Sequence, residues 1–189
     1  MRINSKSDYH YFLRQDIKAL NIVPNFKNKL THDIWQFQKK LRLLEYYINC
    51  KKGYLSKLIT VYLRLSLRKQ GRKLGFSIPP NVFGPGLSIA HAGTIVVNSN
   101  ARIGANCRIH VCVNIGVDIR DGNKAPIIGS NCYIGPGAKI YGAIEIGDNV
   151  GIGANAVVNK SFPSGITIAG VPARKIGDSG PMDYRESQE

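Results

Sequence analysis

The sequence has little that would support a metal centre, secretion or a membrane span. Its four cysteines form no C-x-x-C pair and no Cys/His cluster at zinc spacing: they are Cys50, Cys107, Cys112 and Cys132. The first ten residues lack the apolar core of a signal peptide. No run approaches the ~20 apolar residues that a spanning helix needs. We therefore expect a cytoplasmic protein without a metal, in which Cys107 and Cys132 are buried structural thiols.

Acidic residues are scarce at the start of the chain. Residues 1–75 hold 17 Lys and Arg against 4 Asp and Glu, whereas residues 76–189 hold 9 against 8. Such an excess of positive charge favours nucleic acid, anionic lipid or a polyanionic small molecule as partner. The sequence contains no recognised nucleic-acid-binding module, so we expect no nucleic-acid partner.

Residues 1–75 predict a basic helical region. Apolar residues recur at three- and four-residue spacings from Asp8 to Leu20 and from Thr31 to Asn49, and Thr31 is a candidate N-cap. A third helix is expected from Leu55 to Leu74, with basic residues in its last turns. This helix would pack on the rest of the chain or rest on an anionic membrane as a peripheral contact.

The strongest pattern is a six-residue repeat in the second half of the chain. Aliphatic residues recur every six positions, and glycine follows most of them. The positions are Val97, Ile103, Ile109, Ile115, Ile128, Ile134, Ile140, Ile146, Ile152 and Val158. Neither a helix nor an ordinary strand repeats every six residues, whereas stacked short strands joined by turns do. The sequence therefore predicts a parallel β-helix over residues 76–176, with roughly five coils of three hexads.

The repeat is irregular at two places. Counting back by six from Val97 reaches His91, whereas counting back from Ile95 reaches Ile89, so the phase slips beside the histidine. The stretch from 117 to 125 breaks the repeat entirely and predicts a loop, a common carrier of binding contacts. Beyond the β-helix, residues 177–189 predict a polar tail.

Two histidines, His91 and His110, fall within the predicted β-helix. They lie one coil plus one residue apart, so they should be about one strand layer from each other near one edge. An imidazole can take a proton from a hydroxyl near neutral pH. The alternative for each is an ordinary turn or surface residue.

Three stretches resemble the hexapeptide-repeat acyltransferases, and the nearest branch is similar to the serine acetyltransferases. They read GLSIAHAGTIVVNSNARIGANCRIHVCVNIG, IGPGAKIYGAIEIGDNVGIGANAVV and IAGVPARKIG, within residues 76–177. The resemblance implies a left-handed β-helix after the helical region, acetyl-CoA as donor and no metal. It also implies a homotrimer with active sites at the subunit interfaces.

The resemblance assigns the general base to His91, in the motif A-H-A-G-T, and leaves His110 as a second base or an acceptor ligand. Three groups of the family's site are missing. The Asp before the histidine, which helps to bind serine in the family, is Ala90 here, and the Asp 15 positions before it, which supports the imidazole, is Phe76. An Arg-His pair, whose histidine contacts the serine carboxylate, is Lys124-Ala125. A pocket without partners for the charges of serine should reject it, because they would be buried unpaired.

Further binding residues follow from the resemblance. Glycine-rich turns would contact the pantetheine arm, and basic residues at the last coil would contact the phosphates of coenzyme A. These candidates are Gly135, Gly137, Gly153 and Ala154 for the arm, and Lys160, Arg174 and Lys175 for the phosphates. Acceptor-binding candidates in the expected loop are Asp118, Arg120 and Lys124. The alternatives are plain turn residues of the repeat and solvated charges.

From these departures the sequence predicts an acetyl-CoA-dependent O-acetyltransferase acting on a sugar hydroxyl of a bacterial surface or capsular polysaccharide, or of its precursor. The transfer would be direct, because no Ser or Cys has a base at a recognisable motif spacing.

Two other functions stay open. One is a true serine acetyltransferase of cysteine biosynthesis with a rebuilt pocket, and the other is a non-catalytic β-helix scaffold. A relative of the γ-type carbonic anhydrases is disfavoured, because its zinc needs three imidazoles.

Overall fold

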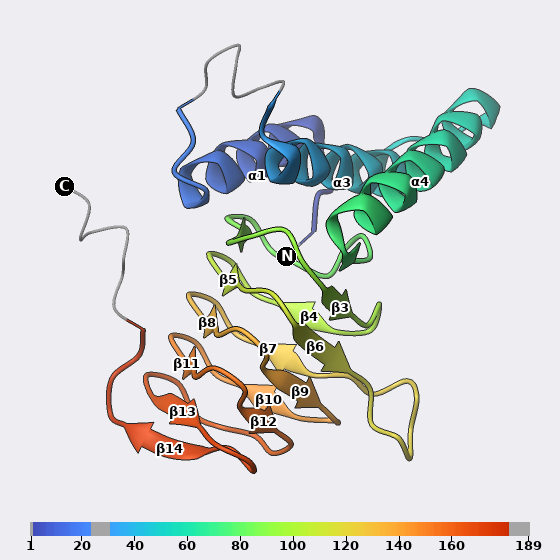
Figure 1. Cartoon of the computed structure of the whole chain (residues 1–189). Helices are drawn as coiled ribbons and strands as arrows, with labels where there is room; N and C mark the ends of the chain where they lie inside the picture. The colour runs from blue at the N-terminus through green and yellow to red at the C-terminus, as the bar shows by residue number, and fades with distance from the viewer. Residues whose placement is uncertain (1, 24–30, 182–189) are drawn as a thin grey trace.

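Three helices and fourteen short strands make up the computed structural model, which describes residues 2–23 and 31–181. The helices are α1 (Lys6–Ala19), α3 (Asp33–Cys50) and α4 (Tyr54–Leu74). Figure 1 shows them across one end of a stack of coils, with α4 projecting to one side. The predicted fold class, a hexapeptide-repeat β-helix preceded by helices, is confirmed. The end of the predicted polar tail, residues 182–189, lies outside the described residues.

Local chemistry sets the helix ends. The Ser5 hydroxyl accepts a hydrogen bond from the backbone of Asp8, 3.0 Å away, and caps α1. The expected N-cap of α3 was wrong by one residue, because the ring of His32, not Thr31, accepts from the backbone of Trp35. Helix α4 ends at Gly75, whose φ of 82° suits a residue without a side chain.

The strands form three parallel sheets, which are the three sides of the β-helix. Sheet A contains β1 (Phe76–Ser77), β3 (Ile95–Val97), β6 (Val113–Gly116), β9 (Lys139–Tyr141) and β12 (Val157–Val158). Sheet B contains β4 (Arg102–Ile103), β7 (Ile127–Ile128) and β10 (Glu145–Ile146). Sheet C contains β2 (Ser88–Ile89), β5 (Arg108–Ile109), β8 (Tyr133–Ile134), β11 (Gly151–Ile152), β13 (Thr167–Ala169) and the antiparallel β14 (Arg174–Gly177).

The repeated aliphatic residues point inward and fill the β-helix. All of them are at most 4% exposed, and each stacks on its equivalent in the next coil, as Ile109 does on Ile134. The small residues two positions earlier are buried too, including the predicted structural thiols Cys107 and Cys132. Because these parallel strands are buried on their inner face and hydrogen-bonded on both sides, each hexad of this chain places an apolar residue there.

Asparagines make the corner between sheets B and C. Asn106, Asn131 and Asn149 occupy this corner in successive coils with φ of 56°, 58° and 56°. Asparagine enters this left-handed region more readily than most residues, which suits it to a tight turn. The side-chain amide of Asn106 donates to that of Asn131 over 3.2 Å, so the corner is also a ladder between coils.

Register locates both irregularities of the repeat. Val97 pairs with Ile115, eighteen positions later, whereas Ile89 pairs with Ile109, twenty positions later. The two additional residues lie in the turn that carries His91. Ile115 pairs with Ile140, twenty-five positions later, and the surplus forms the loop between β6 and β7, yellow in Figure 1.

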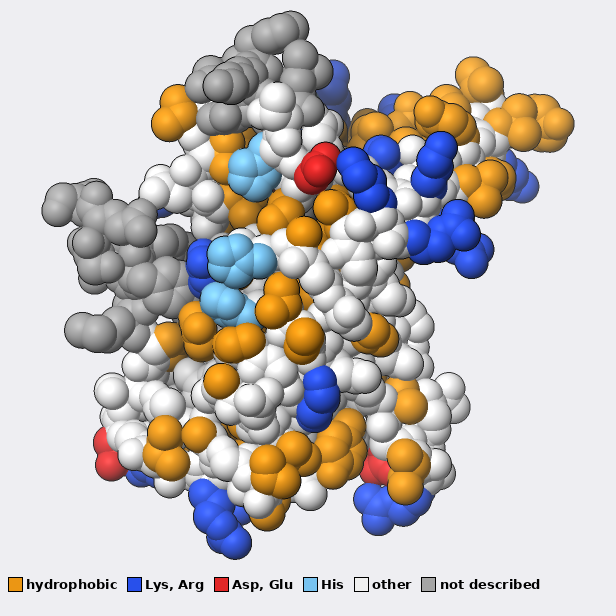
Figure 2. All heavy atoms as spheres, in the orientation of Figure 1, with side chains coloured by type: hydrophobic (Ala, Val, Ile, Leu, Met, Phe, Trp, Pro, Cys, Tyr) orange, Lys and Arg blue, Asp and Glu red, His pale blue; other side chains and the backbone are white. Residues whose placement is uncertain are grey.

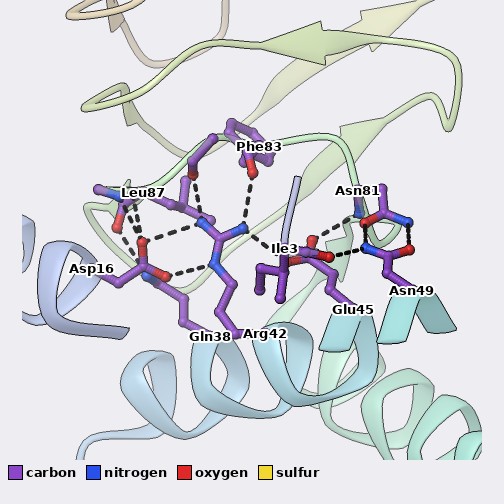
Figure 3. A network of polar contacts seen from close by, with 11 residues as sticks. Ile3, Asp16, Gln38, Arg42, Glu45, Asn49, Asn81, Phe83 and Leu87 are labelled. Carbon is purple, nitrogen blue, oxygen red and sulfur yellow. Dashed lines mark hydrogen bonds and ion pairs between the residues drawn. The ribbon is translucent and has the colours of Figure 1, made fainter. Parts of the chain in front are cut away.

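A buried ion network joins the helices to the first coil (Figure 3). Arg42 of α3 donates to Asp16 of α1 over 2.8 Å and to Glu45 over 3.0 Å, and all three side chains are at most 2% exposed. Arg42 also donates to the carbonyls of Phe83 and Gly84, 2.9 and 2.6 Å away. Asp16 accepts from the backbone of the two residues that precede β2, each over 2.9 Å. The helices therefore hold the segment that leads into the strand before His91.

Replacing Arg42 by alanine should destabilise the chain by about 3–5 kcal/mol, because it leaves two buried carboxylates without their cation. Burial already raises the pKa of Glu45, so this carboxyl would take up a proton most readily. Chemical denaturation of the Arg42→Ala variant measures the loss, with Arg14→Ala, an exposed arginine of α1, as control. Equal stability of the two variants would contradict this role for the network.

Candidate active site

The two histidines of the β-helix meet at the corner between sheets C and A. His91 follows β2 and His110 follows β5, so they come from neighbouring coils. Their ring centroids are 6.2 Å apart, and His91 is exposed whereas His110 is half-buried. Figure 2 shows a pair of histidine side chains side by side on the open face below the helices. The corner thus offers two imidazoles to a molecule bound on the surface.

The end of α4 holds the turn that carries His91. The backbone N–H of Gly93 donates to the carbonyl of Leu74, and that of Ile95 donates to Gly75, each over 2.9 Å. A Cβ atom on Gly75 would lie 2.8 Å from the carbonyl carbon of Gly93, so only glycine allows this approach. The helical region therefore positions the turn from both sides, since the Arg42 network fixes the strand before it.

His110 is kept neutral by its surroundings. Its ring lies 4.9 Å from that of Tyr133 in the next coil. Burial, together with the positive charge of Arg108 and the neighbouring His91, lowers the pKa of His110. Its Nε2 atom is buried and has no hydrogen-bond partner among the described residues. A bound molecule would supply the missing partner.

Sequence reasoning missed three residues beside the histidines. Ser88, Arg108 and Tyr133 are paired positions in adjacent strands of sheet C, each one residue before a buried isoleucine, so they alternate with the inward side chains. Ser88 is buried nonetheless, at 5% exposure. An Arg108 nitrogen donates to the Ser88 hydroxyl over 3.1 Å. The available signal was the hexad itself, in which the position before each aliphatic faces outward. We call Ser88, His91, Arg108, His110 and Tyr133 the histidine cluster.

The predicted pantetheine residues share this corner. Gly135 and Gly137 lie in the turn after β8, and Gly153 and Ala154 lie in the equivalent turn after β11, so they form a column below His110. A Cβ atom on Gly135 would lie 2.7 Å from the carbonyl oxygen of Ile152. Close stacking of coils therefore requires this glycine in any case, and the side chain of Asn155 lies against Gly137 in the same column.

The predicted phosphate-binding residues are divided between two places. Arg174 and Lys175 lie on β14, opposite Ala169 and Ile168 at the end of sheet C, and Lys175 forms an ion pair with Asp178. Lys160 follows β12 instead and lies over the ring of Phe162, at another corner. Arg174 and Lys175 thus belong to the same side as the histidine cluster, whereas Lys160 does not.

The predicted acceptor loop lies away from the histidine cluster of its own chain. It joins β6 to β7, at the corner between sheets A and B. Its charges pair within the loop: Arg120 binds Asp118 over 3.1 Å, and Lys124 binds Asp121 over 3.3 Å. The hydrogen bonds from Arg120 lower the pKa of Asp118 to about 2. The structure therefore does not bring Asp118, Arg120 and Lys124 together with His91.

Phe76, one of the positions that depart from the resemblance, belongs to the packed core. Phe76 is 7% exposed and packs edge-on against Phe37 of α3, with ring centroids 5.1 Å apart.

Cys112 is an exposed free thiol whose backbone carbonyl accepts a hydrogen bond from Lys139. Within residues 2–23 and 31–181, no three His, Cys, Asp or Glu side chains form a group that could hold a metal ion.

Comparison with known proteins gives one family match and many relatives. The family described as "Bacterial transferase hexapeptide (six repeats)" matches residues 125–160. A serine acetyltransferase of Staphylococcus xylosus is 32% identical over 181 residues, covering 93% of this chain and 77% of the relative. One from Synechococcus elongatus is 30% identical over 181 residues, covering 92% and 67%. One from Mycobacterium tuberculosis is 38% identical over 113 residues, covering 57% and 49%, so part of each relative has no counterpart here.

Solved structures agree with these relatives. The serine acetyltransferase of Brucella abortus strain S19 in complex with coenzyme A superposes with a TM-score of 0.76 at 31% identity, covering 93% of this chain and 70% of that chain. The enzyme from Neisseria gonorrhoeae in complex with serine gives 0.69 at 27% identity, covering 92% and 71%.

These relatives overturn the expected polysaccharide acceptor, which was wrong. The relatives described above, in sequence and in structure, are named serine acetyltransferases. The error came from treating three missing side chains, at positions 76, 90 and 125, as the loss of serine recognition. Substitutions remove particular contacts, but they say nothing about the groups that stand elsewhere on the same face, such as Arg108.

The lowered pKa of His110 predicts a pH dependence of stability. Because the folded pKa lies below the unfolded value of about 6.5, the unfolded chain binds the extra proton first, so stability is full above that pH and falls as the pH drops. Urea denaturation at a series of pH values should show that the free energy of unfolding depends less steeply on pH in His110→Gln than in the wild type. His10→Gln, an exposed histidine, is the control. An equally steep dependence of the unfolding free energy on pH in His110→Gln would contradict the prediction.

Proposed function

Because this chain belongs to the hexapeptide-repeat transferase family and aligns along most of its length with serine acetyltransferases, we propose that it transfers an acetyl group from acetyl-CoA to the hydroxyl of serine. The observation that carries the proposal is the pair of imidazoles on one corner of the β-helix, in line with the turns that hold Gly135 and Gly153. Acetyl-CoA is the donor, in keeping with the relative solved with coenzyme A.

In the proposed mechanism His91 is the general base. Its exposed imidazole takes the proton of the acceptor hydroxyl as the oxygen attacks the thioester carbonyl. The carbon–sulfur bond then breaks, and the proton passes to the departing thiolate of coenzyme A. No covalent acyl-enzyme is needed, and the half-buried His110, kept neutral, is a hydrogen-bonding ligand of the acceptor.

The donor would lie along the corner below His110. Its pantetheine arm follows the column of Gly135, Gly137, Gly153 and Ala154, where a narrow chain can approach the backbone. The phosphates of the donor would then lie on the same side of the molecule as Arg174 and Lys175, at the end of sheet C. Lys160 belongs to this set only if a neighbouring subunit presents it.

We further propose that the protein works as a homotrimer with its sites between subunits. Asp118, Arg120 and Lys124 stand at the corner between sheets A and B, whereas the histidine cluster stands at the corner between C and A. The loop can therefore serve a site only from an adjacent copy. Apolar side chains such as Val96, Ile127 and Tyr141, which are 38–50% exposed here, would gain cover in such an assembly.

Peripheral contact of the basic helices with an anionic membrane, and a cytoplasmic location, stay predictions. Helix α4 exposes Leu55, Leu58, Val61, Tyr62 and Leu65 beside several basic residues. In the described part of the chain, no helix is long and apolar enough to cross a bilayer.

The test of the function is release of free thiol from acetyl-CoA on addition of L-serine, followed with the full-length protein. Wild type should turn over, and His91→Ala should lose about a hundredfold to ten-thousandfold in kcat, because a positioned base contributes that much. His10→Ala, which removes an exposed histidine of α1, is the control. Absence of turnover with serine would refute the acceptor, and an unaffected His91→Ala variant would refute the base.

The proposed assembly predicts a particle of about three times the chain mass of 20.8 kDa in light scattering at working concentration. Activity should fall as the particle dissociates on dilution, since the loop would then leave its neighbour's site. A monomer with undiminished activity would contradict sites formed between subunits.

A further inference from the structure

We propose that a groove between α4 and the first coil binds the phosphate group of an anionic phospholipid, and that the exposed face of α4 rests on the membrane beside it. The site lies outside the histidine cluster and does not depend on acetyl transfer. It gives the predicted membrane contact its residues and its ligand.

The groove combines positive charge with apolar walls. Its volume is about 580 Å³, and three exposed arginines of α4 line it at four-residue spacings, Arg64, Arg68 and Arg72. Most of the other lining residues are apolar, among them Val61, Leu65, Ile78, Pro79 and Pro80. Guanidinium groups bind phosphate oxygens through charge-assisted hydrogen bonds. Such a groove fits a molecule that carries a phosphate next to hydrocarbon.

The three arginines have no acidic partner in the protein. Among residues 2–23 and 31–181, none of them forms an ion pair. The sequence contains no Asp or Glu from position 46 to position 117, a stretch that includes all of α4. Like charges four residues apart on a helix repel each other, and a bound anion would relieve that repulsion. The countercharge therefore has to come from another molecule.

Helix α4 is apolar on two opposite faces. Leu63, Leu67 and Leu74 are buried against the rest of the chain. The other face carries large apolar side chains that are 51–79% exposed: Tyr54, Leu55, Leu58, Val61, Tyr62 and Leu65. Figure 2 shows orange and blue side chains next to one another along the projecting helix. Exposed apolar residues beside cations, without acids, are typical of a helix that lies in a membrane interface.

Charge and hydrophobicity together select the lipid from the possible occupants. A second helical region is disfavoured, because residues 1–75 hold 17 Lys and Arg against 4 Asp and Glu and two such regions would repel each other. A nucleic acid would neutralise the arginines but leave the exposed leucines in water. An anionic phospholipid meets both requirements, since its phosphate pairs with guanidinium and its acyl chains cover the apolar face.

The proposed homotrimer would strengthen the contact. The loop and the histidine cluster lie at the same level of the stack, so copies that they join stand side by side. Rotational symmetry then places all three helical regions at one end of the particle. Three weak contacts with one surface add up to a much tighter attachment.

Sedimentation of the full-length protein with lipid vesicles tests the site. Wild type should bind vesicles of phosphatidylcholine mixed with phosphatidylglycerol, more weakly at high salt, and should not bind phosphatidylcholine alone. Arg64→Gln/Arg68→Gln should weaken binding about twentyfold or more, because each basic residue at an anionic surface contributes about fivefold. Arg102→Gln/Lys160→Gln, which removes two exposed charges of the β-helix, is the matched control.

A second variant tests the apolar face. Leu55→Gln/Leu65→Gln changes two side chains that are 70% and 61% exposed, so the fold should be kept. It should weaken binding to the anionic vesicles although every arginine is still present. Thiol release with serine, measured without vesicles, should equal that of wild type in both double variants and so reports that they are folded.

The outcomes separate this proposal from the proposed function. Wild type that binds anionic vesicles without turning over serine overturns the function alone. Turnover of serine by a wild type that ignores anionic vesicles, or by double variants that bind them as tightly as wild type, overturns the lipid site alone. A smaller particle in light scattering together with unchanged vesicle binding would overturn it in favour of a second copy on α4. Tighter binding of wild type to a DNA duplex than to the vesicles would overturn it in favour of nucleic acid.

Discussion

The stacking of one coil on the next is the constraint on which the rest of the molecule depends. Neighbouring coils are joined by backbone hydrogen bonds in both directions: the N–H of Ile103 donates to Val82 in the preceding coil over 2.9 Å, and that of Gly135 donates to Ile152 in the following coil over 2.8 Å. Side chains at equivalent positions must therefore lie directly above one another. As a consequence, isoleucines stack on isoleucines in the interior, and outward-facing side chains form columns on the surface.

The candidate site depends on one turn in which the coils do not stack in strict register. Two additional residues beside His91 push the turn outward, and the end of α4 and the Arg42 network hold it there. The second irregularity, the loop between β6 and β7, leaves the coil at a different corner. In the proposed homotrimer, the two interruptions would come together from adjacent copies.

Electrostatics explains how the site differs from what its motifs suggest. Positions 76 and 90, where the resemblance expects acids, hold Phe76 and Ala90, and the guanidinium of Arg108 acts on the second imidazole, His110. Burial, together with the charge of Arg108, lowers the pKa of His110, and the buried Nε2 of this ring has no hydrogen-bond partner among the described residues. The missing acids suggested a sugar acceptor, whereas the relatives are named serine acetyltransferases. A β-helix face offers many outward positions, so one lost contact can be replaced from a neighbouring strand.

The sequence by itself determined the β-helix, its inward residues and the approximate positions of the helices, because a repeat that must stack is visible as a period in the chain. It also located the turn at His91 and the loop after Ile115 as interruptions of that period. Only the tertiary structure decided that Ser88, Arg108 and Tyr133 share one row, that Phe76 belongs to the core and that the loop stands at another corner. These facts depend on which face a side chain takes and on which coil lies beside it, and hydrogen bonds between residues about twenty positions apart set both.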